Sequence, residues 1–104
     1  MIIVTTETVP GRETIESLGI VSGNVVQSKH IGRDIMAGLK TIIGGEVRGY
    51  TEMLTDAREK AVTRLTENAT NLGADAVVNV RFTTSAIMQG MSEILAYGTA
   101  VKLG

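Results

Sequence analysis

The chain has 104 residues, of which 43% are hydrophobic and 20% charged, and its formal net charge is -1. This length and balance predict a single folded domain over residues 1–104 and exclude a disordered chain. Because the chain has no cysteine, it can form no disulfide framework, thiolate metal site or cysteine nucleophile. Because it has no cationic excess, it lacks the charge that a nonspecific nucleic-acid binder needs.

Residues 2–6 are apolar and β-branched, which predicts a short strand. They lack the basic start and the apolar length of a signal peptide. No apolar run reaches the ~20 residues of a membrane-spanning helix. We therefore expect a soluble cytoplasmic protein with no membrane partner.

Residues 13–29 look extended, because their apolar residues recur without helical spacing. We expect a bulge at Gly19 and a turn at 22–24 inside this long bent strand or hairpin. The next segment changes to helical spacing and predicts a shorter helix that stops at Gly44-Gly45. Its apolar positions are Ile31, Ile35, Leu39 and Ile42, with Met36 and Ile43 beside them.

Residues 50–72 predict the clearest element, a long amphipathic helix with Gly73 as its C-terminal cap. Small residues in its apolar stripe would let the helix lie close to a sheet. The stripe consists of Tyr50, Leu54, Ala57, Ala61, Leu65, Ala69 and Leu72.

The rest of the chain predicts a strand over 74–85, a loop over 85–92 and a last strand over 91–103. Alternation places Ala76, Val78, Val80 and Phe82 on one face of the first of these strands. The complete order is β-β-α-α-β-β. It predicts an α+β fold in which one long helix and a shorter one accompany a small, mostly antiparallel sheet.

The last strand is apolar on both faces, which one helix cannot cover. We expect a second copy of the chain to cover the remaining face, because a large exposed apolar patch marks an interface. The alternative is a fold that curls on itself. The expected interface residues are Leu95, Tyr97, Val101 and Leu103.

Short motifs of glycine, small and charged residues recur along the whole chain. They are Gly19-x-Val21-x-Gly23, Arg33-Asp34, Gly44-Gly45, Gly49-Tyr50, Ala57-Arg58-x-x-Ala61, Gly73-Ala74-Asp75-Ala76-Val77 and Gly98-Thr99-Ala100-Val101. Together these motifs resemble the pattern of the YbjQ family, whose members are described as heavy-metal-binding. The resemblance implies a dodecin-like subunit in a homopentameric ring, and it brings no established activity.

Two ligand sites are conceivable at the start of the shorter helix. His30 and Asp34 are four residues apart, but a zinc site needs about three or four ligands, so a metal would require symmetry mates or Glu46. Lys29 and Arg33 beside a helix N-terminus favour a small anion. A solvated helix entry is the alternative for all of these residues.

The remaining polar residues of the family pattern are Arg58 and Asp75, and we expect them to tie a helix end to the sheet or to a neighbouring subunit. With Tyr50 they complete the set of candidate binding residues. No nucleophile elbow or plausible triad is present. Dodecins stack flavin on tryptophan, which this chain lacks, so we expect no cofactor.

Together these observations predict a non-enzymatic, self-assembling protein that binds a small ligand or a partner. The alternative is a metal- or anion-binding ring, or an enzyme, with a site between subunits near the start of the shorter helix.

Overall fold

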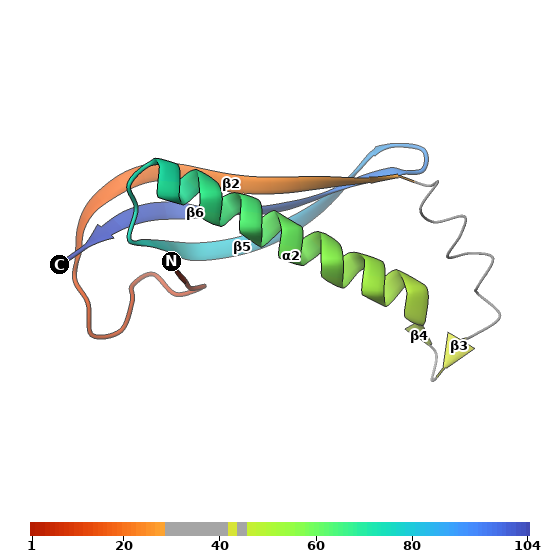
Figure 1. Cartoon of the computed structure of the whole chain (residues 1–104), viewed down its shortest axis with the longest axis horizontal. Helices are drawn as coiled ribbons and strands as arrows, with labels where there is room; N and C mark the ends of the chain where they lie inside the picture. The colour runs from red at the N-terminus through yellow and green to blue at the C-terminus, as the bar shows by residue number, and fades with distance from the viewer. Residues whose placement is uncertain (29–41, 44–45) are drawn as a thin grey trace.

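A computed structural model describes residues 1–28, 42–43 and 46–104 (Figure 1). The main sheet has the strand order β1-β5-β6-β2, with β1 parallel to β5 and the other neighbours antiparallel. A separate two-stranded pair joins β3 to β4. The elements are β1 (Ile2–Ile3), β2 (Thr14–Ser28), β3 (Ile42–Ile43), β4 (Glu46–Val47), α2 (Arg48–Asn71), β5 (Ala76–Met88) and β6 (Met91–Leu103).

The fold is α+β, as predicted, with a four-stranded mixed sheet and one long helix. Figure 1 shows α2 crossing the sheet obliquely, and its N-terminal end lies beside β4, away from the four strands. We call the side of the sheet that carries α2 the helix face and the opposite side the outer face. Within the described residues, no helix is both long and apolar enough to cross a membrane.

The apolar stripe of α2 is confirmed at its centre. Ala57, Ala61, Leu65 and Ala69 are completely buried against β2 and β6. The stripe is not buried at its ends, because Leu54 and Leu72 are exposed. Gly73 caps the helix as predicted, with a positive φ of 79° and a bond from its N–H to the Thr70 carbonyl.

Gly23 explains how closely α2 approaches the sheet. A Cβ at this position would lie 2.3 Å from both the Ala61 carbonyl oxygen and the Leu65 nitrogen. The turn predicted at 22–24 is therefore wrong, because these residues pair continuously with β6. Glycine serves here for close packing rather than for a turn. The predicted irregularity at Gly19 is confirmed, since the register shifts there and φ is 99°.

β5 contains a bulge that the sequence pattern does not show. Asn79 has a φ of 54°, and the pairing with β6 shifts between Val78 and Arg81. The predicted alternation is therefore wrong after Val78. Val77 and Val80 belong to the core under the helix, whereas Ala76 and Val78 belong to a second core.

This second core lies on the outer face and is closed by the N-terminal segment. Val9 is buried there, with Val4 packed beside it. Val101 and Leu103, which we expected at an interface, are only 2% and 7% exposed because residues of their own chain cover them. Of the four residues expected at an interface between copies, only Leu95 and Tyr97 therefore remain available on the outer face.

Two other expectations concern connections. Ile42–Ile43 were expected in the shorter helix but form β3, which pairs antiparallel with β4, and β-branched residues favour such an extended backbone. The rest of that helix lies outside the described residues. The loop expected over 85–92 is wrong. β5 continues to Met88 and β6 begins at Met91, since Gly90 adopts a left-handed φ of 81° that closes a tight turn.

Candidate functional site

The structure tests only part of the expected binding set. Lys29, His30, Arg33 and Asp34 lie outside the described residues. The backbone of Tyr50 lies in the first turn of α2, but the structure does not describe the side chain of this residue.

Arg58 and Asp75 do not meet. Arg58 is exposed, and its Nη2 donates to the Thr55 hydroxyl at 3.4 Å. It lies thirteen residues before the end of α2, or about 20 Å at the usual helical rise. Asp75 follows the C-terminal cap of that helix.

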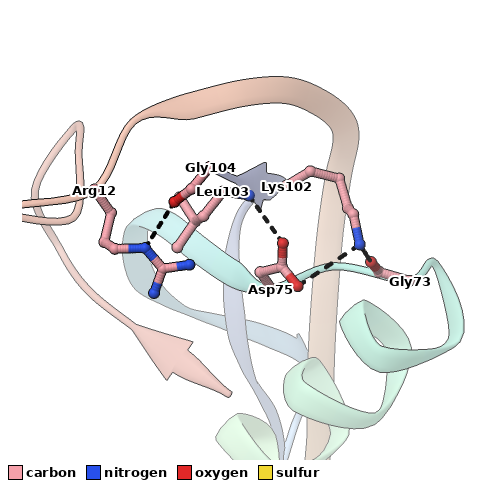
Figure 2. A network of polar contacts seen from close by, with 6 residues as sticks. All are labelled: Arg12, Gly73, Asp75, Lys102, Leu103 and Gly104. Atoms are coloured by element: carbon pink, nitrogen blue, oxygen red, sulfur yellow. Dashed lines mark hydrogen bonds and ion pairs between the residues drawn. The ribbon is translucent and has the colours of Figure 1, made fainter.

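A polar network surrounds Asp75 at the end of the sheet where the chain terminates (Figure 2). The Leu103 N–H donates to Asp75 Oδ2 at 2.9 Å, and Lys102 Nζ lies 3.6 Å from Asp75 Oδ1. Lys102 also donates to the Gly73 carbonyl at 2.9 Å. Arg12 donates to the Gly104 carbonyl at 2.9 Å. The network thus ties the helix end, the N-terminal segment and the last residues of β6 together.

The electrostatics of Asp75 fit a structural tie. The bond from the Leu103 N–H lowers the pKa of the Asp75 carboxyl below its usual value, and the positive charges of Lys102 and Arg12 act in the same direction. Partial burial acts in the opposite direction and is outweighed. The carboxylate is therefore held ionised at neutral pH, the opposite of what a general acid requires.

A groove opens at the other end of the sheet, between the N-terminal half of α2 and the β5–β6 hairpin. Its volume is about 380 Å³, which lies within the usual range of small-molecule sites. Four elements contribute to its lining, in which the described residues are Gln27, Met53, Leu54, Thr84, Ser92 and Ile94. Sequence reasoning missed this groove because its lining residues come from separate parts of the chain and form no recognisable motif.

The lining determines what the groove can do chemically. Of the described lining side chains, three are apolar, three are neutral and polar, and none is charged. Elsewhere in the described parts of the chain, no group of three His, Cys, Asp or Glu residues is placed to hold a metal ion. The described lining residues therefore supply no carboxylate, imidazole or thiol to the groove.

The same end of the sheet exposes the edge formed by β5. At the other end of β5, β1 and the residues after it bond to the first part of this strand. On the opposite edge of the sheet, Arg64 and Asn68 of α2 donate hydrogen bonds to carbonyls of β2. Within the described ranges, nothing pairs with the outward side of residues 82–88, which we call the bare edge. Phe82 is 46% exposed, and Tyr97 on the adjacent strand is 39% exposed.

Comparisons with known proteins agree over the whole chain. A family model named YbjQ and described as "Putative heavy-metal-binding" matches residues 1–104. A UPF0145 protein of Shewanella frigidimarina is 71% identical over 104 residues, covering 100% of this chain and 97% of the relative. A UPF0145 protein of Archaeoglobus fulgidus is 64% identical over 103 residues, covering 99% of this chain and 95% of the relative.

A solved structure shows a similar fold. It is a protein of unknown function from Pediococcus pentosaceus that belongs to the DUF74 family. Its TM-score is 0.67 at 15% sequence identity, and the match covers 100% of this chain and 98% of that one. At this identity the similarity concerns the fold alone.

Proposed function

The chain belongs to the YbjQ family, and we propose that it is a non-enzymatic protein that assembles with copies of itself and holds a small ligand in the groove. The observation that carries the proposal is a groove of ligand size whose lining, among the residues that the structure describes, includes no titratable side chain. A site of this kind supplies contact and hydrogen bonds, whereas catalysis near neutral pH uses a group whose pKa is tuned to that pH.

Self-assembly is supported by the surface near the groove. The bare edge offers unpaired backbone N–H and C=O groups, which natural proteins normally cover. Phe82, Leu95 and Tyr97 add apolar surface close to it. The YbjQ resemblance implies a homopentamer of dodecin-like subunits, and we propose that assembly.

Native mass spectrometry of the protein purified without chelator tests the assembly. We expect a complex of about five times the 11.0 kDa subunit. Replacing both Phe82 and Tyr97 with lysine should shift the complex toward monomer, because each substitution places a charge in the proposed interface. Glu67→Lys on the exposed side of α2 is the matched control and should leave the mass unchanged.

Two results would contradict the proposal. If the wild-type protein has the mass of a monomer, the proposed assembly is wrong. A metal present at fixed stoichiometry and lost on His30→Ala would instead favour the metal-binding ring at the start of the expected shorter helix.

A further inference from the structure

We propose that the groove selects an uncharged, largely apolar molecule with one hydrogen-bonding end. This inference deepens the proposed function and rests on it. Nothing in the family description names such a ligand.

The apolar part of the site comes from both sides of the groove. Met53 and Leu54 project from α2, and Ile94 comes from β6. Ile94 is almost completely buried, so it forms the floor, whereas Leu54 is 40% exposed at the mouth. A ligand that covers these side chains removes apolar surface from water, which favours binding in proportion to the area covered.

The polar part comes from three adjacent strands on the helix face. Gln27 of β2 pairs in register with Ser92 of β6, and Thr84 of β5 pairs with Ile94. Their side chains therefore border the same floor. In the part of the chain that the structure describes, none of these three side chains forms a hydrogen bond with another protein group, so each can bond to a ligand.

The six described lining residues carry no charge, and this favours a neutral ligand. An ion entering the groove would lose part of its hydration and find no opposite charge among these described residues. A neutral hydroxyl or carbonyl loses less and recovers its bonds from Thr84, Ser92 or Gln27. The volume of about 380 Å³ admits a molecule of one or two rings.

Three probes with the same naphthalene ring but different charge distinguish neutral, anionic and cationic ligands at pH 7. They are neutral 2-naphthol, anionic 2-naphthoate and cationic 2-naphthylmethylammonium. Each is titrated into the full-length protein with ¹³C-labelled methionine methyl groups. The chain has five methionines, of which Met53 lines the groove and Met88 and Met91 lie at the hairpin turn. Met53→Leu assigns the groove signal.

We expect 2-naphthol to shift the Met53 signal and to bind at least tenfold more tightly than either ion. Tighter binding of an ion at Met53 would overturn the inference and leave the proposed ligand site standing. If no probe moves Met53, or if only Met88 and Met91 respond, the groove is not a ligand site and both proposals fail.

A matched pair of variants tests the hydrogen-bonding end. Thr84→Val removes the hydroxyl at nearly constant volume, and Thr83→Val makes the same change on the opposite face of the strand. We expect Thr84→Val to weaken 2-naphthol binding three- to tenfold and to leave binding of unsubstituted naphthalene unchanged. Thr83→Val should alter neither. Equal effects of the two variants on 2-naphthol, or none, would contradict the role of Thr84.

Discussion

The two ends of the sheet differ in how completely the chain covers them. At the closed end, around residues 76–80 and 99–103, α2 covers one face and the N-terminal segment covers the other. At the open end, around residues 82–92, α2 diverges from the sheet, the groove lies between them and the bare edge has no partner among the described residues (Figure 1). Stability is thus concentrated at one end, and surface suited to binding is concentrated at the other.

The largest expected effect comes from the contact that fixes α2 on the sheet. Gly23→Ala should lower the free energy of unfolding by more than about 3 kcal/mol, the upper end of overpacking costs, because the new Cβ collides with the helix backbone. Urea denaturation measures this loss. Ser22→Ala, one residue away, is the control and should change stability by less than about 0.5 kcal/mol.

The same substitution at two positions of α2 compares the two ends directly. Leu65 is completely buried, so Leu65→Ala should cost about 3 kcal/mol. Leu54 is 40% exposed at the groove mouth, so Leu54→Ala should cost about 1 kcal/mol or less. Equal losses in thermal or urea denaturation would show that the groove end is packed as tightly as the core.

The bulge in β5 predicts a smaller effect at the closed end. Asn79→Val should destabilise the protein by about 1–2 kcal/mol, because a β-branched residue tolerates a positive φ poorly. Asn79→Gly keeps the conformation accessible and should be close to neutral. If valine is tolerated as well as glycine in urea denaturation, the left-handed conformation is wrong.

The smallest expected effect is the pH dependence that Asp75 contributes. Its pKa is lower in the folded protein than the ordinary 3.8, so it stabilises the fold above that value. The contribution disappears as the pH falls through the lower, folded pKa. Asp75→Asn should therefore reduce stability at pH 7 and flatten the decrease below pH 4 in denaturation curves. Lys102→Met should move that decrease to higher pH. Unchanged pH profiles in both variants would contradict the account of this network.

The sequence predicts the elements whose residues repeat with a regular period. The Ala57, Ala61, Leu65 and Ala69 stripe and the boundaries of β6 are confirmed for this reason. The role of a single residue was harder to predict where its residue type suits more than one local structure. Gly23 could serve a turn or a close contact, and an asparagine such as Asn79 gives no local sign that a strand bulges there.

The groove could not be predicted, because its lining comes from four elements and its residues are chemically ordinary. The hydrophobic pattern of the sequence also could not predict that the N-terminal segment covers part of the outer face of the sheet. Val9 lies in an irregular segment, and only the folded chain brings it onto Val101 and Leu103. The polar family residue Asp75 was correctly expected to tie a helix end to the sheet.

Amide hydrogen exchange of the assembled protein, resolved by residue, tests most directly whether the open end is where this chain meets its partner. Val77 and Val78 at the closed end supply the internal standard of a covered strand. The account predicts that the outward-pointing amides of residues 82–88, the bare edge, are also protected, because a second copy covers them. Exchange of those amides at the rate of a free strand edge, in a sample shown to be assembled, would contradict it.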